Sequence, residues 1–167
     1  MKIKQLVLAI SLIALAVCLV SCASSGTGSA ASTPADPDLA ALDAAVEASF
    51  NKMSTSLTPG LTIALLPINA ADRDRGNYAY ENITIMFFDT RLFEMVERNR
   101  IDAILKEQNF QYSGLVDDRT AAEIGKFLGA KVIIIGDITG SGSTRRLVFR
   151  GLDVETAKIL AMAQERF

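Results

Sequence analysis

Few residues in this chain of 167 could do chemistry, because the sequence contains no histidine. Histidine is the most common general base near neutral pH and the most common metal ligand, so its absence excludes Ser-His-Asp and Cys-His catalysis. The two cysteines, Cys18 and Cys22, both lie near the N-terminus. The rest of the chain can therefore form no internal disulfide and no thiolate metal site.

Three other parts of the sequence contain residue types found in binding or catalytic sites. Each of them has a simpler structural interpretation. The glycine-rich stretch 136–142 leads from one expected strand into another and lacks the lysine and helix N-terminus of a phosphate-binding loop. Asp72 and Asp74 are interleaved with arginines, whereas Ca²⁺ needs about six or more oxygen ligands. Glu97 and Arg98 favour a strand-end ion pair over an acid-base pair. The sequence thus predicts no catalytic, cofactor-binding or metal-binding residue.

The charge of the chain gives no basis for nucleic-acid binding. There are 17 basic and 19 acidic residues, the net charge is -2 at pH 7, and the longest basic run is Arg145-Arg146. Binding to a phosphate backbone needs a clustered basic face, so nucleic acid is not an expected partner. The hydrophobic fraction of 50% predicts one folded domain.

Hydrophobic periodicity predicts the elements of that domain, beginning with an amphipathic helix. Apolar residues recur every three or four positions over 39–57, with Asp38 as the expected N-cap. A Pro-Gly pair ends this helix. The continuous apolar run 61–68 is typical of a strand buried on both faces, and a polar loop is expected over 69–77.

The middle of the chain predicts two further helices after a segment of mixed character. Residues 78–92 show both β-like and helical spacing, and we favour a helix. The alternating stretch 93–97 predicts a strand, and Asn99 is the expected N-cap of the helix that follows. Asp117 is the expected N-cap of a helix over 118–128, which a glycine ends.

The last part of the chain predicts strands. The β-branched run within 131–138 is expected at the centre of a sheet. Two alternating strands, 145–154 and 158–166, follow a glycine-rich turn, with Ile159 and Ala161 on one face. The expected fold is therefore α/β (α+β), a mixed β-sheet with helices packed on it that ends in a β-hairpin.

The first 21 residues contain, in order, the segments of a bacterial signal peptide. Two lysines precede an apolar run of about 15 residues, which is shorter than the roughly 20 that a membrane-spanning helix needs. Leu19-Val20-Ser21-Cys22 resembles the lipobox of bacterial lipoproteins, in which the cysteine becomes the lipid-modified N-terminus. An uncleaved anchor helix is the alternative. We predict a signal peptide over 1–21, a covalent diacylglycerol and N-acyl lipid on Cys22, and no other cofactor.

The residues after Cys22 predict a tether. Small and polar residues over 22–38 cannot offset their ordering entropy, which indicates a flexible lipid-anchored linker before a folded domain over 39–167. Ala23 directly follows the cysteine, at the position where an aspartate marks inner-membrane retention of lipoproteins. The resemblance therefore implies an outer-membrane location facing the periplasm.

Three segments, 93–108, 113–136 and 152–160, together resemble the curli production assembly/transport component (CsgG) family. The family's motif positions that they contain are Glu97, Arg98, Gly125, Gly129, Gly136, Asp153 and Thr156. Ala157 stands where the family usually has glycine in the hairpin turn. The resemblance covers about residues 61–167 and implies structural roles for these motif residues.

The family resemblance implies a function without catalysis. Its relatives, the penicillin-binding protein activator LpoB and FlgO-type lipoproteins, are lipid-anchored, non-enzymatic envelope proteins with a domain similar to the N-terminal domain of TolB. This chain lacks the long lipid-facing hairpins of the curli secretion channel. The expected function is a non-enzymatic outer-membrane lipoprotein with a periplasmic protein-binding domain that regulates peptidoglycan synthesis.

The expected partners are envelope proteins, either a peptidoglycan synthase or an assembly complex, and the membrane through the lipid anchor. An alternative is a subunit of a CsgG-like secretion or flagellum-associated assembly without transmembrane hairpins of its own, which would make the chain a homo-oligomer. An enzyme that acts on cell-wall material is a third interpretation, but the sequence shows no evident pair of carboxylates for it.

Overall fold

The computed structural model describes residues 36–107 and 117–167. The predicted signal peptide, Cys22 and most of the predicted tether lie outside the described residues. The elements along the chain are α2 (Pro37–Ser56), β1 (Thr62–Leu65), β2 (Asn69–Ala70), α3 (Arg73–Asp89), β3 (Glu94–Met95), α4 (Arg98–Glu107), α5 (Asp118–Leu128), β4 (Val132–Thr139), the 3-10 helix η1 (Gly142–Thr144), β5 (Arg146–Asp153) and β6 (Ile159–Arg166). None of the helices in these ranges is long and apolar enough to cross a bilayer.

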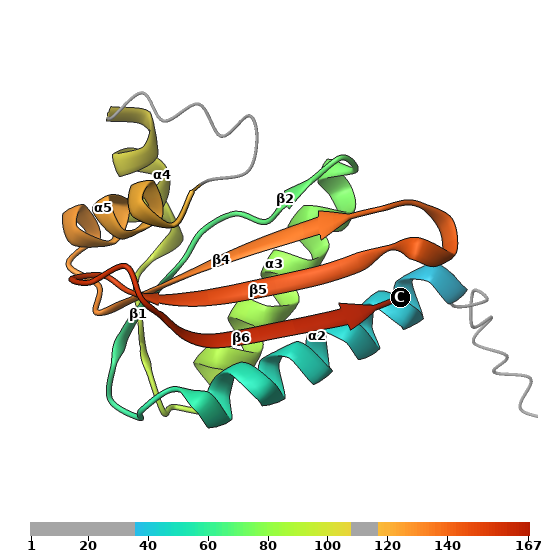
Figure 1. The fold of residues 1–167 in the computed structure, drawn as a ribbon, viewed down its shortest axis with the longest axis horizontal. Coiled ribbons are helices and arrows are strands. Elements are labelled where there is room, and N and C mark those ends of the chain that lie inside the picture. Colours follow the sequence, from blue (N-terminus) through green and yellow to red (C-terminus); the bar gives the residue numbers. More distant parts are fainter. Residues whose placement is uncertain (1–35, 108–116) are drawn as a thin grey trace, which may run out of the picture. The chain divides into compact units, whose positions relative to one another are not determined.

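The sheet is mixed, and β4 lies at its centre. The strand order is β3-β1-β4-β5-β6, and the short β2 pairs with β4 as well (Figure 1). β1 is parallel to β3 and β4, whereas β5 and β6 are antiparallel to their neighbours and form the final hairpin. The predicted mixed sheet, its central strand and its terminal hairpin are confirmed.

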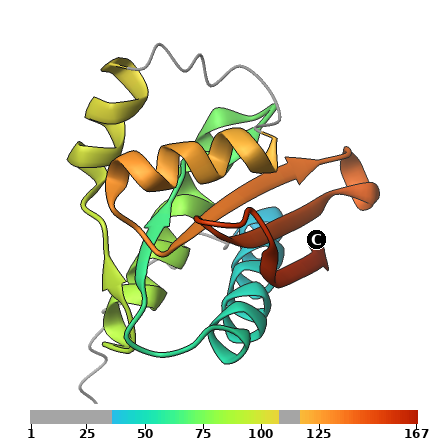
Figure 2. The ribbon, with the colours of Figure 1, turned by 60° about the vertical axis from the view of Figure 1, so that its left-hand side comes forward.

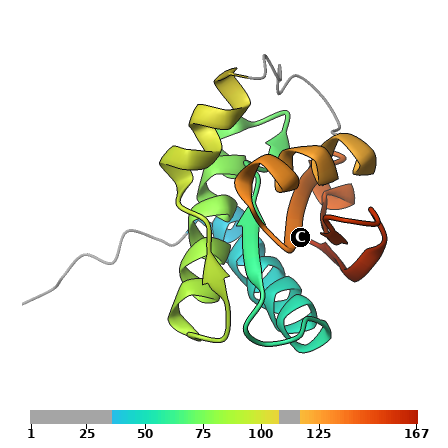
Figure 3. The same cartoon turned by 90° about the vertical axis from the view of Figure 1, so that its left-hand side faces the viewer.

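Helices cover both faces of the sheet. Because side chains alternate along a strand, Ile134 of β4 packs with α2 and α3, whereas Ile133 packs with α4 and α5. Phe87 of α3 and Phe149 of β5 are the largest fully buried side chains, and both belong to the first of these two cores. α5 lies over the strands in Figure 2, and α3 and α5 lie on opposite sides of the strands in Figure 3.

The first helix begins earlier than its periodicity suggests, and the prediction of Asp38 as its N-cap is wrong. Asp36 is the N-cap, and its carboxylate accepts a hydrogen bond from the backbone N–H of Asp38 at 3.0 Å. Pro37 is the first helical residue, a position at which its missing N–H would have no partner in any case. Asp38 is therefore free for contacts outside the helix.

The predicted loop over 69–77 is also wrong. Asn69–Ala70 forms β2, which pairs in parallel with the end of β4, and α3 begins at Arg73. Asp72 caps α3 by accepting hydrogen bonds from the N–H groups of Asp74 and Arg75 at 3.1 and 3.3 Å. The acidic residues that suggest a loop thus start a helix. The helix favoured over 78–92 is confirmed as far as Asp89.

The elements around α4 and α5 agree with their predictions except at one cap. The strand expected over 93–97 is the short β3. Asn99 is not an N-cap, because it lies inside α4. Asp117 caps α5 as predicted, and Gly129 ends α5 in the left-handed conformation at φ 70°.

The last strand differs from its predicted alternation at one end. Ala161 pairs with Gly151 and is buried, but Ile159 pairs with Leu152 and is 49% exposed. The register shifts between these two pairs, so β6 carries one extra residue, Leu160, and a β-bulge. The prediction that Ile159 shares the buried face of Ala161 is therefore wrong.

The hairpin turn holds Ala157 at φ 57°, where a Cβ costs roughly 1–2 kcal/mol. Glycine removes this strain but adds conformational entropy to the unfolded chain. We expect Ala157→Gly to raise the free energy of unfolding by about 0.5–1 kcal/mol in urea denaturation. The matched change Ala103→Gly, at an exposed site in α4, is expected to lower it by about 1 kcal/mol. An unchanged or lower stability of Ala157→Gly would contradict the inferred strain.

Candidate functional site

Four of the family-motif residues lie at the end of the sheet where β4 begins and β5 ends. A Cβ on Gly125 would lie 2.5 Å from Val154 Cγ2, so glycine allows α5 to approach the sheet closely. Gly129 ends α5. Asp153 accepts hydrogen bonds from the backbone N–H and the hydroxyl of Thr156, both at 2.7 Å, and so closes the β5–β6 turn. These bonds lower the pKa of the Asp153 carboxyl below its usual value.

The other three motif residues lie away from this end of the sheet: Gly136 is within β4, and Glu97 and Arg98 are at the start of α4. A Cβ on Gly136 would lie 2.6 Å from the ring of Phe149, so this position in β4 also accommodates close packing. The Glu97 carbonyl accepts hydrogen bonds from the N–H groups that open α4. The structure therefore brings the motif residues together only in part, and their contacts are those of turns, helix ends and close packing.

Arg98 pairs with residues other than its sequence neighbour Glu97. Its guanidinium lies 3.7 Å from a Glu81 oxygen and 3.9 Å from an Asp102 oxygen. The Arg98 guanidinium carbon is also 4.8 Å from the centre of the Tyr80 ring, in a cation–π arrangement. Burial raises the pKa of the Tyr80 phenol, and the nearby positive charge of Arg98 opposes that rise.

A groove of 280 Å³ lies beside these residues, between α3 and the β3 edge of the sheet. It is lined by Leu65, Tyr80, Glu81, Thr84, Ile85, Met95, Val96 and Arg98. Most of these side chains are apolar, and the lining holds no nucleophile next to a general base. Across the residues that the structure describes, no group of three or more His, Cys, Asp or Glu side chains could hold a metal ion.

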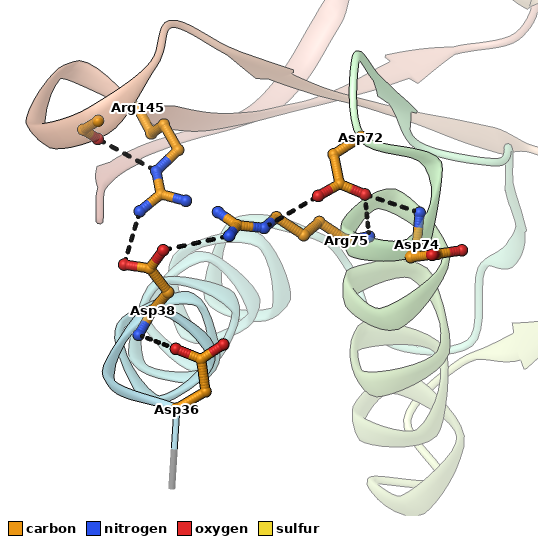
Figure 4. A network of polar contacts seen from close by, with 7 residues as sticks. Asp36, Asp38, Asp72, Asp74, Arg75 and Arg145 are labelled. Carbon is orange, nitrogen blue, oxygen red and sulfur yellow. Dashed lines mark hydrogen bonds and ion pairs between the residues drawn. The ribbon is translucent and has the colours of Figure 1, made fainter.

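Asp38 connects three elements at the other end of the domain (Figure 4). One carboxylate oxygen is 2.8 Å from Nη2 of Arg145, and the other is 3.1 Å from Nη2 of Arg75. Arg75 pairs in addition with Asp72 at 3.1 Å, and Arg145 donates from Nε to the carbonyl of Gly142 at 3.1 Å. The first turn of α2, which follows the predicted tether, is thereby fixed to α3 and to the β4–β5 connection.

This ion-pair network is absent from the sequence-based predictions, in which Asp38 is a helix cap and Asp72 is weighed only as a calcium ligand. Pro37 was the available signal, because a proline at the first helical position moves the cap to Asp36 and leaves Asp38 free. The pairing of Asp38 with Arg145 joins distant parts of the chain, and no local pattern predicts it.

The β6 edge is a second surface suited to contacts with another protein. No described strand pairs with its outer side. Ala161 and Ala163 are buried in the core that β6 shares with α2, whereas Ile159, Leu160 and Met162, here called the β6 patch, are 49, 45 and 53% exposed. An unpaired edge with apolar side chains beside it can accept a strand from a partner.

We expect Asp38→Ala to leave Arg75 and Arg145 without their shared counter-ion. Because Asp38 is 47% exposed, the free energy of unfolding should fall by about 1 kcal/mol or less, and by less at high salt. Hydrogen exchange should also become faster at residues 142–145 and in the first turn of α2. The exposed Glu47→Ala is the matched control on the same helix and should change neither quantity. Unchanged exchange at 142–145 in Asp38→Ala would disprove the link.

Comparison with known proteins agrees with the fold. The LpoB C-terminal domain from Escherichia coli superimposes with a TM-score of 0.64 at 15% identity, covering 75% of this chain and 97% of that one. The corresponding domain from Salmonella enterica gives 0.60 at 15% identity, covering 77% and 96%. Lipoprotein GNA1162 from Neisseria meningitidis gives 0.50 at 12% identity, covering 64% and 81%.

Similarity in sequence extends over a shorter part of the chain than similarity in fold. No curated protein sequence matches the chain. The family model of the curli production assembly/transport component CsgG matches residues 83–158, which run from α3 through the hairpin turn. This range contains all seven motif residues named above. The chain is therefore similar to the CsgG family over residues 83–158, and its domain has the fold of the LpoB C-terminal domain.

Proposed function

We propose that this chain is a non-enzymatic lipoprotein of the bacterial outer membrane that binds an envelope protein through its periplasmic domain. The observation that carries the proposal is the match of fold to the C-terminal domain of LpoB, over 97% of that domain. LpoB activates a penicillin-binding protein, so the proposed role is regulation of peptidoglycan synthesis. The CsgG-like motifs are consistent with an accessory protein of the envelope.

The surface of β6 supports a binding function. The β6 patch is apolar and exposed, and it lies at the edge of the sheet, where a partner strand could add main-chain hydrogen bonds. On the other face of the strand, the ion pair of Glu165 with Lys52 connects β6 to α2. The domain thus holds the strand in place, and no strand in 36–107 or 117–167 pairs with its outer edge.

The predicted anchor and tether would hold this surface close to a membrane. A flexible linker of the predicted length spans roughly 20–25 Å on average. Asp38, in the first turn of α2, is fixed by two ion pairs, so the flexible part would end where α2 begins. A partner that resides in the same membrane or in the adjacent cell wall would then be within reach.

A subunit of a CsgG-like assembly is the second candidate function. The family match supports it, together with exposed apolar side chains away from β6, such as Ile85 and Phe88 on α3. The size of the detergent-extracted protein separates the two functions. A ring subunit would give a high-order oligomer, whereas a regulator that acts alone would be a monomer.

We predict that Cys22→Ala abolishes incorporation of labelled fatty acid and leaves the chain as an unprocessed precursor. Cys22 carries the thiol that lipidation needs, whereas Cys18 would leave with the signal peptide. The matched variant Cys18→Ala should therefore be labelled and processed like the wild type. Mass spectrometry of the purified chain measures both outcomes. Fatty-acid labelling that survives in Cys22→Ala would rule out the predicted anchor.

We predict that a photo-crosslinking residue at Met162 captures an envelope protein when the full chain is expressed in its own cell. The same residue at Lys126, on the exposed side of α5, is the control and should capture much less. Met162→Glu should weaken binding of the captured partner at least about tenfold, because a charge would replace apolar contact. Its unfolding temperature should stay unchanged, since Met162 is 53% exposed. Equal capture at both positions would count against β6 as the binding surface.

A further inference from the structure

We infer that Arg146 and Arg166 form a binding site for a phosphate group at the open end of the hairpin. These two residues are direct partners across β5 and β6. Both side chains are exposed. Because directly opposed residues share a face of the sheet, two positive charges lie next to each other there, an arrangement that is unfavourable without an anion.

The neighbouring arginines have counter-ions, and this pair has none among the described residues. Arg150 lies 2.6 Å from an Asp118 oxygen and 3.5 Å from an Asp137 oxygen. Arg145 pairs with Asp38 at 2.8 Å and lies against the ring of Phe167. In the described ranges, no carboxylate lies within 4.0 Å of the guanidinium nitrogens of Arg146 or Arg166. Two uncompensated guanidinium groups therefore lie on one patch of surface.

A concave site accompanies the two charges. A pocket of 230 Å³ is lined by Gly140, Ser143, Thr144, Arg146 and Arg166. Its size is several times the roughly 30 Å³ that one water occupies in the liquid. The Thr144 hydroxyl is engaged with the backbone of Ser141. The Ser143 hydroxyl makes no hydrogen bond to another described residue, so it can donate to a ligand.

The chemistry of the pocket favours phosphate over a carboxylate. Each guanidinium offers a planar fork that binds two oxygens side by side. A carboxylate has two oxygens and can satisfy one fork well, whereas a phosphate monoester has three terminal oxygens and can bind both forks and a hydroxyl. A phosphate monoester also carries a charge of about -1.5 to -2 at pH 7, which offsets two arginines.

The position of the site suggests where the phosphate comes from. Arg146 follows Arg145, whose partner Asp38 lies in the first turn of α2 (Figure 4). If the proposed lipid anchor is present, membrane headgroups lie within reach of this end of the domain. A soluble phosphate compound is the other source. Only the lipid source rests on the proposed anchor, because the arginine pair is part of the folded domain.

The test uses the full chain in a non-ionic detergent and titration calorimetry at constant ionic strength. The probes are inorganic phosphate and dihexanoylphosphatidic acid, a water-soluble lipid whose headgroup is a phosphate monoester. We expect Arg146→Gln/Arg166→Gln to bind the probe at least about tenfold more weakly than the wild type. The matched double variant Arg119→Gln/Lys126→Gln removes the same charge from α5 and should bind within about twofold of the wild type.

A second measurement separates a binding role from a structural one. Without phosphate, Arg146→Gln/Arg166→Gln should unfold at the same temperature as the wild type or higher, because it removes like-charge repulsion. Binding of the phosphatidic acid that is tighter than binding of inorganic phosphate supports the site with a lipid headgroup as ligand. Binding of inorganic phosphate alone supports it with a soluble ligand. Binding of neither probe, or undiminished binding by the double variant, would overturn the inference.

Discussion

Burial of β4 on both faces is the constraint on which the rest of the domain depends. Its side chains alternate between two cores, one under α2 and α3 and one under α4 and α5. A strand of this kind must lie inside the sheet, with a neighbour on each side. β1 and β5 take these places, one parallel and one antiparallel, and the terminal hairpin follows from the second pairing. Gly136 is part of the same close packing around β4, because a Cβ at this position would clash with the ring of Phe149.

The helices cover one face of the sheet over a shorter length than the other. The candidate binding surfaces lie where this cover is missing. α5 packs on the start of β4 and the end of β5, where Gly125 meets Val154. Beyond α5, the hairpin continues with no helix in front of it (Figure 1). The exposed arginine pair lies on this uncovered part of the hairpin, and the β6 patch follows its outer strand. α2 supports the hairpin from behind. Within the part of the chain that the structure describes, the hairpin is thus supported on one face, and its other face and outer edge are left uncovered.

Much of this fold follows from the sequence because its signals are local. α5 has an Asp cap, an apolar stripe and a closing glycine, and all three act within the helix itself. The sequence predictions failed where a local signal has two meanings or where contacts are distant. Acidic residues near 72 indicate a loop or a helix start, and only the pairing of β2 with β4 decides between them. Ile159 follows the expected alternation until a bulge changes its register. The pairing of Asp38 with Arg145 has no local signal at all.

The motif residues and the binding surfaces are therefore different parts of the molecule. Gly125, Gly129 and Gly136 permit close packing or end a helix, and Asp153 with Thr156 closes a turn. These roles preserve the shape of the domain without specifying a partner. The family match ends at residue 158, directly before β6 begins. Most of the surface to which we assign binding thus lies outside the range that the family model matches. At 15% identity, the similarity to LpoB shows a shared fold and does not specify a partner.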